Sequence, residues 1–365
     1  MKIAFDYQIF SQQRFGGISR YYSSLIRELI KLNQEVNVYA GFYKNNFLKS
    51  LSNEFVKGHY LKKYPPKTGK VFNLINNLWS YNQINSSNSN LVHQTYYSNN
   101  AKINKKVPIV VTALDMIHEL YPEENDDNSI YQRKKNTFKR ADHIICISNN
   151  TKDDLVNIYG VYPEKISVTY LASNDWTNVC FQNIDNDIHS PYILYVGERS
   201  GYKNFSSLIK AFASSKYLRN DFNIITFGGK RFNKSELGFI ESFGLLKNVK
   251  QRFGDDSVLA SMYSGASALI YPSLYEGFGI PPLEAMAFNC PVIASNTSSI
   301  PEVVGIAGEY FNPTDIEDIK NAIENVVFSP SRIADLKYKG LDRVKEFSWR
   351  KCATETLEIY QKISR

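Results

Sequence analysis

The chain has 365 residues, enough for two domains of about 150 residues each. Hydrophobic residues make up 43% of it and charged residues 22%, which excludes a disordered chain. The net charge is +7, and all of it lies in residues 1–180, where 22 Lys and Arg outnumber 15 Asp and Glu; the other 21 and 21 cancel. This excess predicts an anionic partner (a membrane surface, a phosphorylated carrier or nucleic acid), although solvated helix faces explain any single cluster equally well.

The cysteines and the lengths of the apolar runs indicate the cellular compartment and argue against a metal site. The four cysteines are far apart, and no histidine lies at metal-ligand spacing from Cys146, Cys180, Cys290 or Cys352. We therefore expect reduced thiols in a reducing compartment. The start, MKIAFDYQIF, has no long apolar region and no run reaches 18 apolar residues, so neither a signal peptide nor a membrane span is predicted. A cytoplasmic location follows as an expectation.

In the first half, short apolar runs alternate with helical periods, as in a parallel, doubly wound α/β sheet. Strands are predicted at 2–7, 35–41, 89–95, 107–115, 142–148 and 165–172, and helices at 14–33, 131–141 and 149–160. The polar stretch 173–191 breaks this pattern and is predicted to be a linker with a hinge at 173–190.

The alternation restarts after the linker. Strands are predicted at 192–198, 222–229, 268–273 and 291–295, and helices at 204–215, 257–266, 281–288, 315–327 and within 343–364. We therefore predict an N-terminal domain at 1–175, a C-terminal domain at 190–345, and a last helix at 346–365 that packs back onto the first domain.

The stretch SLYEGFGIPPLEAMAF, residues 273–288, follows a predicted buried strand. Gly277 and Gly279 allow a close backbone approach to a ligand, and Pro281 and Pro282 suit the first turn of a helix. The amides from Phe278 onward then form a helix N-terminus, which favours phosphate groups or sugar hydroxyls. Asn289 stands where a left-handed residue would end this helix.

Two carboxylates belong to the same stretch. Glu276 and Glu284 would repel phosphate, but a carboxylate accepts hydrogen bonds from the two hydroxyls of a sugar or ribose diol. A turn residue and a helix-dipole partner are the alternative interpretations, and each is reasonable when taken alone. The pair beside the glycine turn favours binding of two hydroxyl-bearing rings.

With its two glutamates eight residues apart, this stretch resembles the donor-site signature of retaining GT-B glycosyltransferases of family 4. The segments FGGISRYYSSLIREL, ADHIICISNNTKDDL, YILYVGERSGYKNFSSLIKAF and SSIPEVVGIAGEYFNPTD are similar to other parts of that family. HQTYY, DMIHELYP and SSIPEVVG are most similar to mannosyltransferases of bacterial O-antigen and capsule synthesis. The resemblance implies a GT-B fold, in which two Rossmann-like domains face each other across a cleft.

The resemblance also implies roles for residues of the C-terminal half. Glu276 would hold the transferred sugar, and Glu284 the nucleotide ribose. The backbone amides that would assist are those of Gly277, Phe278, Gly279 and Ile280. Lys203 would clamp the diphosphate, with Arg199 as a second clamp in a segment shorter than in some relatives. Both cations stand near a helix start, where the dipole disfavours them, so surface charge is a weaker explanation.

The N-terminal half carries the resemblance less completely. Gly16 and Gly17 would form the loop that faces the diphosphate, although an ordinary strand-to-helix turn explains two glycines as well. Where the family has His-Asp, this chain has Leu114 and Asp115. Asp115 alone, His118 one turn later, or His93 in LVHQTYY could supply the missing group, and a structural role remains the alternative for each histidine.

The reaction implied is transfer of mannose from GDP-mannose to a glycan acceptor with retention, by front-face attack, in O-antigen or capsule synthesis. The acceptor would sit on a lipid diphosphate carrier at the inner membrane surface; no nucleic acid and no separate cofactor are expected. No metal is expected either, because Asp126-Asp127 and Asp255-Asp256 lie in polar loops and form no D-x-D at a strand end. A UDP- or dTDP-sugar donor, a nucleotide-sugar epimerase or phosphorylase, and a decayed glycan-binding or nucleic-acid-binding homologue remain alternatives.

Overall fold

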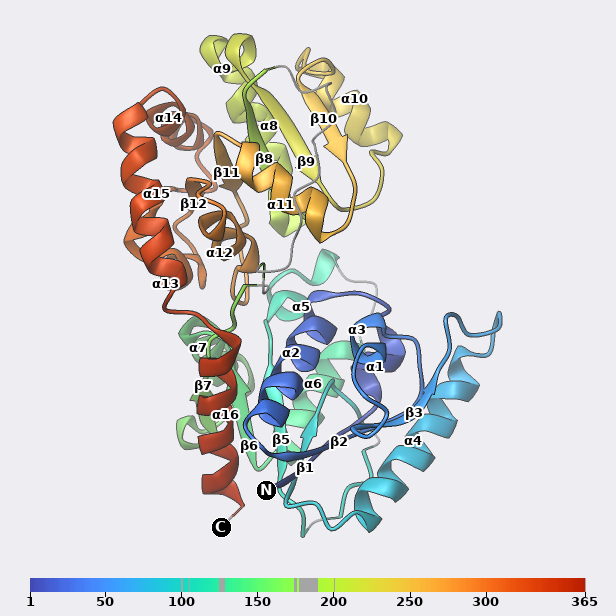
Figure 1. Cartoon of the computed structure of the whole chain (residues 1–365). Helices are drawn as coiled ribbons and strands as arrows, with labels where there is room; N and C mark the ends of the chain where they lie inside the picture. Colours follow the sequence, from blue (N-terminus) through green and yellow to red (C-terminus); the bar gives the residue numbers. More distant parts are fainter. Residues whose placement is uncertain are drawn as a thin grey trace. The chain divides into compact units, whose positions relative to one another are not determined.

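The computed structural model describes residues 1–99, 101–104, 106–124, 129–173, 176, 190–199 and 201–364. The chain forms two compact units: unit 1 is Met1–Leu171 with Ser348–Arg365, and unit 2 is Ala172–Phe347 (Figure 1). Most of the expected hinge at 173–190 lies outside the described residues, as do Cys180 and Asp126-Asp127. Within the described ranges, no helix is long and apolar enough to cross a membrane.

Unit 1 is built on a seven-stranded sheet in which every neighbouring pair of strands is parallel. The strand order is β3 (Val56–Tyr60), β2 (Glu35–Tyr43), β1 (Lys2–Phe5), β4 (Leu91–Gln94), β5 (Ile109–Ala113), β6 (His143–Cys146) and β7 (Ile166–Val168). The helices are α1 (Gln8–Gln12), α2 (Gly17–Lys31), α3 (Asn46–Lys49), α4 (Gly69–Ser86), α5 (Ile117–Leu120), α6 (Ser129–Arg140), α7 (Asn149–Tyr159) and α16 (Trp349–Ile363), with short 3-10 turns at Pro122–Glu124 and Pro163–Lys165. The central strands are almost wholly buried, as expected for strands covered on both faces.

The last helix, α16, packs within unit 1 against α2. Its buried face includes Cys352, Ala353 and Tyr360, which recur at helical spacing. The Tyr360 hydroxyl lies 2.5 Å from Nδ1 of His93 on β4. Trp349 adds a ring contact to Tyr21 on α2, with 6.2 Å between the centroids. Helix α16 therefore belongs to the same compact unit as Met1–Leu171.

Unit 2 contains a six-stranded parallel sheet. Its order is β10 (Val249–Arg252), β9 (Asn223–Phe227), β8 (Tyr192–Val196), β11 (Ala268–Tyr271), β12 (Val292–Ser295) and β13 (Gly308–Phe311). The helices are α8 (Phe205–Ser214), α9 (Lys216–Asp221), α10 (Lys234–Ser242), α11 (Asp256–Gly265), α12 (Ile280–Ala287), α13 (Ile300–Val304), α14 (Ile316–Val327) and α15 (Pro330–Val344), with 3-10 turns η3 (Gly201–Lys203) and η4 (Gly305–Ala307). Both sheets confirm the predicted parallel α/β class.

The strand order of unit 2 reverses at β8, the first strand of its sheet. From β8 the chain proceeds to β9 and β10 on one side, and then crosses to β11 on the other. Ligands of open α/β sheets bind at the carboxyl ends of the strands beside such a reversal. The segments after β8 and β11 therefore define the place to look for a site, and they contain Lys203 and Glu276.

Three of the four cysteines lie in described parts of the chain. Cys146, Cys290 and Cys352 are unpaired and buried, as expected for reduced thiols. Burial raises the pKa of the Cys290 and Cys352 thiols to about 12, so both remain protonated at neutral pH.

Candidate active site

Lys203 and Glu276 meet at the carboxyl edge of the unit 2 sheet. The Nζ of Lys203, from the turn after β8, lies 2.6 Å from Oε1 of Glu276, which follows β11. The lysine side chain is 20% exposed and the glutamate side chain 9%, so the ion pair is largely shielded from water. These two residues are 73 positions apart in the sequence and were predicted to share one site. The fold brings them into direct contact.

Aromatic rings surround this ion pair. Nζ of Lys203 lies 5.2 Å from the ring centroid of Tyr202 and 6.0 Å from that of Tyr271. Burial, together with the negative charge of Glu276, holds the pKa of Tyr271 well above its ordinary value. The phenol of Tyr271 therefore stays protonated.

The glycine turn after Glu276 leads directly into α12. Gly279 is the N-cap of this helix and has φ +108° and ψ 62°, a conformation that side chains other than glycine rarely adopt. Pro281 and Pro282 occupy the first turn, as predicted. Phe278 is buried and its ring packs edge-on against Phe347, with centroids 5.9 Å apart. The helix N-terminus is thus fixed next to the Lys203–Glu276 pair.

Two serines that sequence reasoning did not assign to the site hold this turn. The Ser299 hydroxyl donates to the carbonyl oxygens of Glu276 (2.8 Å) and Phe278 (3.0 Å). The backbone N–H of Glu276 donates to Oγ of Ser298, 3.0 Å away. Ser299 stands in the N-cap position of α13, but its side chain makes no capping bond there. A serine before a helix is ordinarily interpreted as a cap, and only the tertiary structure shows the different use.

A third residue missed by the sequence analysis is Asn204, which follows Lys203. Its side-chain N–H₂ group donates to the carbonyl oxygens of Pro272 (3.1 Å) and Pro313 (2.8 Å). Its backbone is left-handed, with φ +56°, which asparagine tolerates better than most residues. Asn204 therefore ties the lysine turn to the segment between β11 and Glu276. Its position beside Lys203 in the GYKNF segment was the available signal.

Glu284 lies in the middle of α12 and is almost wholly buried. Its Oε2 accepts a hydrogen bond from the Tyr263 hydroxyl on α11, 3.0 Å away. Burial, reinforced by the charge of Glu284, raises the pKa of Tyr263 well above its ordinary value, so the phenol remains a donor. The acid is oriented from one side by a fixed hydroxyl.

Arg199 has a different environment from Lys203. Its Nε lies 2.8 Å from Oε1 of Glu236 at the start of α10, and Nη2 donates to the carbonyl of Lys230 at 2.6 Å. The guanidinium also stacks over Phe232, 4.3 Å from the ring centroid, and the side chain is 3% exposed. These contacts join β8, β9 and α10, so the structure assigns Arg199 a bracing role; its part as a diphosphate clamp stays a prediction.

The two N-terminal glycines begin α2 in unit 1. Gly16 is the N-cap, and a Cβ there would lie only 2.3 Å from Oε1 of Gln13. That same oxygen accepts from the backbone N–H of Ser19, 3.1 Å away. A Cβ on Gly16 would therefore displace the Gln13 side chain from its contact with Ser19, whereas a Cβ on Gly17 would meet nothing within 4 Å.

Asp115 and His118 lie together at α5, beside a buried lysine that the sequence analysis passed over. Nδ1 of His118 is 4.0 Å from Oδ1 of Asp115. Nζ of Lys134 donates to the carbonyl oxygen of Asp115 at 2.9 Å and to Oε2 of Glu119 at 2.8 Å, and its side chain is 1% exposed. Leu114, in place of the family histidine, is buried, and its N–H lies 3.3 Å from the Tyr97 hydroxyl.

His93 is the one histidine candidate whose suggested role is wrong. It is fully buried, with Nδ1 against Tyr360 at 2.5 Å and Nε2 against Thr112 at 2.9 Å. Burial lowers its pKa to about 3, so the ring is neutral at physiological pH. Because both nitrogens are engaged inside unit 1, His93 cannot contact an acceptor and joins α16 to the sheet instead.

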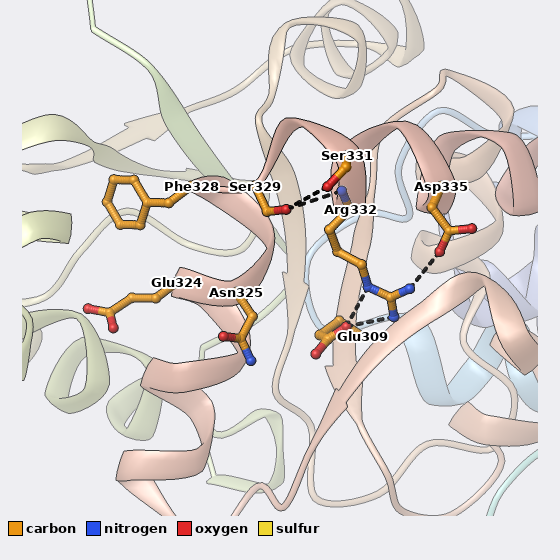
Figure 2. A pocket seen from close by; sticks show the side chains of 8 residues that line it. All are labelled: Glu309, Glu324, Asn325, Phe328, Ser329, Ser331, Arg332 and Asp335. Carbon is orange, nitrogen blue, oxygen red and sulfur yellow. Dashed lines mark hydrogen bonds and ion pairs between the residues drawn. The ribbon is translucent and has the colours of Figure 1, made fainter.

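A hollow of about 660 Å³ in unit 2 is formed by residues other than the predicted ones (Figure 2). The guanidinium of Arg332 bonds Glu309 through Nε (2.8 Å) and Nη2 (2.7 Å), and Asp335 through Nη1 (2.6 Å). Its central charge is thus neutralised by two acids, and the hollow is open surface between α14, α15 and β13. Nowhere in the described ranges do three or more His, Cys, Asp or Glu gather in an arrangement that could hold a metal ion.

Two protein-family models match this chain, and together they cover most of its length. Glycosyltransferase Family 4 matches residues 15–172, and Glycosyl transferases group 1 matches residues 181–343. The chain belongs to the family 4, group 1 glycosyltransferases. The resemblance seen in the Glu276–Glu284 segment and in the N-terminal glycine loop is thereby confirmed at the level of the family.

Relatives and solved structures refine this assignment. The chain is 28% identical over 253 residues to O-antigen chain mannosyltransferase B of Escherichia coli, covering 66% of each protein. It is 32% identical over 235 residues to O-antigen chain mannosyltransferase RfbU of Salmonella typhimurium, covering 62% of this chain and 64% of that one. The chain thus spans just under two thirds of these relatives.

Among solved structures, HepE of Anabaena in complex with UDP and glucose matches with a TM-score of 0.73, at 17% identity over 99% of both chains. At this identity the likeness shows the fold alone. Together with the two parallel sheets, it shows that this family member has the two-domain GT-B fold.

Proposed function

We propose that this chain is a retaining glycosyltransferase that moves mannose from GDP-mannose onto a glycan acceptor in the synthesis of bacterial O-antigen or capsule. The observation that carries the proposal is the Lys203–Glu276 contact of 2.6 Å beside the N-terminus of α12. It supplies, at one sheet edge, an acid for sugar hydroxyls, a cation for phosphate, and backbone N–H groups.

The chemistry assigned to these groups follows from where charge develops. As the bond between the sugar C1 and the phosphate oxygen breaks, negative charge builds on the departing nucleoside diphosphate. An ammonium has three N–H donors, so Lys203 can hold Glu276 and a phosphate oxygen at the same time. A cation already oriented by Glu276 stabilises this charge without reorganisation. In the proposal no metal is required for that step.

Retention follows in the proposal from attack on the face that the phosphate leaves. The acceptor oxygen bonds to C1 on that face, its proton passes to the departing phosphate oxygen, and the pair of electrons of the broken bond stays on the phosphate. Glu276 holds a hydroxyl of the transferred sugar, and Glu284 holds the ribose diol. The Tyr263 hydroxyl, 3.0 Å from Oε2 of Glu284, keeps that carboxylate oriented.

The donor is proposed from the relatives. Two of them are named mannosyltransferases of O-antigen chains, which favours a mannosyl donor. A UDP-sugar is the second candidate, because the solved HepE structure contains UDP and glucose. The acceptor is proposed to be a glycan on a lipid diphosphate at the inner membrane surface, in line with the basic excess of residues 1–180. In unit 1 we propose Asp115 with His118, in place of the absent family histidine, as the groups that face the acceptor.

The test is a titration of the pure protein with GDP-mannose, UDP-glucose and a dTDP-sugar, followed by assay of donor turnover. Lys203→Ala and Glu276→Gln are expected to reduce turnover by about 100-fold or more, the loss typical for removal of one electrostatic stabiliser. Lys210→Ala and Glu241→Gln, exposed in the same unit, are the matched controls and should behave as wild type.

Each outcome of this test has a defined meaning. Turnover of only a UDP- or dTDP-sugar would replace the donor, and binding without turnover would indicate the decayed glycan-binding homologue. Wild-type rates in Lys203→Ala or Glu276→Gln would show that the site is wrong.

A further inference from the structure

Helix α4 of unit 1 carries a row of apolar side chains on the side that faces solvent, besides Tyr81 and Ile84, which it buries in the core. Val71, Leu74, Ile75 and Leu78 are 56%, 61%, 42% and 59% exposed. Their spacing of i, i+3, i+4 and i+7 places them on one face, which we call the α4 stripe. Scattered exposed apolar residues need no explanation, but a contiguous row of four marks an interaction surface.

The opposite face of α4, toward the sheet, is polar where it meets β2. Asn76 accepts from the backbone N–H of Phe42 (2.7 Å) and donates to its carbonyl oxygen (2.8 Å). The Ser80 hydroxyl donates to the carbonyl of Tyr39 at 2.8 Å. Further along the helix, Tyr81 and Ile84 pack into the core, so α4 covers the sheet without using the stripe. The α4 stripe therefore cannot be explained by the packing of unit 1.

A row of lysines begins at the same end of the helix. Lys62, Lys63, Lys67 and Lys70 are all exposed, in the loop before α4 and in its first turn. Cations at a helix N-terminus are unfavourable for the helix dipole, so they do not serve the stability of α4. Residues 55–114 contain no Asp or Glu at all, while their lysines are Lys57, Lys62, Lys63, Lys67, Lys70, Lys102, Lys105 and Lys106.

The loop that carries these lysines is held against the helix. The ring of Tyr64 stacks on Phe72 of α4, with centroids 4.7 Å apart and planes at 14°. The Tyr64 hydroxyl also donates to the carbonyl of Phe42 at 2.7 Å. In Figure 1 the loop and α4 lie together at the β3 edge of unit 1. The positive charges and the α4 stripe therefore belong to one surface.

An apolar hollow of about 230 Å³ adjoins the stripe. It is lined by Gly41, Phe42, Gly58, His59, Ile75, Asn76 and Trp79. Ile75 is shared by the stripe and the hollow, so apolar surface continues from the face of α4 toward β2 and β3. An exposed apolar row with lysines at its border is the pattern of a helix that lies in the interface of a bilayer.

We propose that α4 and the loop before it dock unit 1 onto an anionic lipid bilayer, with the α4 stripe among the acyl chains and the four lysines at the lipid phosphates. The charge argues for this occupant: a surface with lysines and no acid from residue 55 to 114 is complementary to anionic headgroups. A second copy of the chain would bring the same positive charges together. The inference extends the proposed function, whose acceptor is carried by a membrane lipid, and identifies the surface that reaches it.

The experiment is co-sedimentation of the full chain, without nucleotide, with vesicles of phosphatidylglycerol and phosphatidylethanolamine and with vesicles of phosphatidylcholine. We expect binding to the phosphatidylglycerol-containing vesicles, and only weak, salt-insensitive binding to the phosphatidylcholine vesicles. Leu74→Gln with Leu78→Gln should reduce binding by about tenfold or more, because two leucines lose their burial in lipid. Each Lys→Gln change at Lys62, Lys63, Lys67 or Lys70 should weaken it about fivefold and flatten its salt dependence.

The matched control is Leu237→Gln with Ile306→Gln, which removes two exposed apolar residues from unit 2 and should leave binding unchanged. No binding of the wild-type chain to anionic vesicles, or equal binding by the α4 variants, would overturn the proposal. So would a change from dimer to monomer in the leucine variants by sedimentation velocity, since the stripe would then be a contact between copies. Titration with GDP-mannose keeps this result separate from the proposed function: vesicle binding requires no donor, and donor affinity should be equal in all these variants.

Discussion

The hydroxyl of Ser299 donates to the carbonyl oxygens of both Glu276 and Phe278, one residue on either side of Gly277. Gly277 and Gly279 have no side chains to pack, so this hydroxyl, Ser298 and the Phe278–Phe347 contact help to fix the shape of the turn. The position of the acid relative to Lys203 therefore depends on a residue that has no charge.

For this reason Ser299→Ala is expected to lower kcat/KM for the donor by about fivefold, because the O–H that is shared between the two carbonyls, a hydrogen bond of about 1 kcal/mol, is lost from the turn. Steady-state kinetics and circular dichroism check this. Ser242→Ala, at an exposed serine on α10 with one local bond, is the control and should retain wild-type rates. An unchanged kcat/KM in Ser299→Ala would show that the turn is held by other contacts.

A substitution at Arg199 can separate its two possible roles, which are bracing of the fold and binding of the diphosphate. Lysine keeps the charge at this site but loses the planar fork that reaches Glu236 and the Lys230 carbonyl together. We expect Arg199→Lys to lower the free energy of unfolding by about 1–2 kcal/mol, less than for a fully buried pair because Glu236 is partly exposed. Urea denaturation measures this, with Arg231→Lys as an exposed control. A stable variant with weakened GDP binding would instead support the diphosphate clamp.

Helix α12 ends at Ala287, and its end can be tested as an element of the site. Asn289 adopts the left-handed conformation predicted for it, with φ +56°. Asn289→Ala keeps the Cβ but removes the side-chain amide that makes this region tolerable for asparagine, and is expected to destabilise unit 2 by about 1 kcal/mol, whereas Asn289→Gly should be within a few tenths of wild type. Thermal and urea denaturation compare the three proteins. Equal stability of the alanine and glycine variants would mean that the backbone strain is relieved elsewhere.

The contact between α16 and the sheet should depend on pH through His93. Burial lowers the pKa of His93 to about 3, against 6.5 for an ordinary histidine. Between these values the unfolded chain binds a proton that the folded chain does not. The contribution of His93 is therefore complete above about pH 6.5 and is lost at about 1.4 kcal/mol per pH unit as the pH falls below it.

The prediction is that the stability difference between wild type and His93→Gln is constant from about pH 7 to 8 and shifts against wild type from about pH 6 to 5. Urea denaturation across this range measures it. Burial raises the pKa of Asp6 and so acts in the opposite direction, but Asp6 is present in both proteins and cancels. If the free energies of unfolding of the two proteins ran parallel at all pH values, His93 would take up a proton without opening the core.

At the scale of the whole molecule, the inner strands of both sheets were predictable because most of their residues are apolar. Edge strands were not: β3 (VKGHY) and β10 (VKQR) have too few apolar residues to be recognised. Helix α4 was missed because Asn76 and Ser80 share its buried face with Tyr81 and Ile84 while other apolar residues are exposed, so no single apolar face marks the helix. Glu276 and Lys203 were recognised from local motifs, whereas the roles of Ser299, Arg199 and Lys134 depend on partners distant in sequence.

Unit 1 is assembled from two separate parts of the chain, which leads to a prediction for truncation. Removing 348–365 would expose the surface of α2 and β4 that Tyr360, Ala353 and Cys352 cover. We expect unit 1 of a 1–347 chain to become sensitive to protease while unit 2 remains resistant. Limited proteolysis with mass spectrometry distinguishes the two, with the full chain as control. Equal resistance of unit 1 in both proteins would contradict the structural importance of α16.

The chain crosses from unit 1 to unit 2 after Leu171 and returns before Ser348. A single backbone cut between Leu171 and Tyr192 would therefore leave an N-terminal fragment whose natural complement, α16, remains covalently attached to the C-terminal one. The two pieces would remain one particle on a sizing column and separate only in denaturant. The protein could thus be produced as two complementary polypeptides that are labelled independently and that reassemble through the native packing of α16 on unit 1.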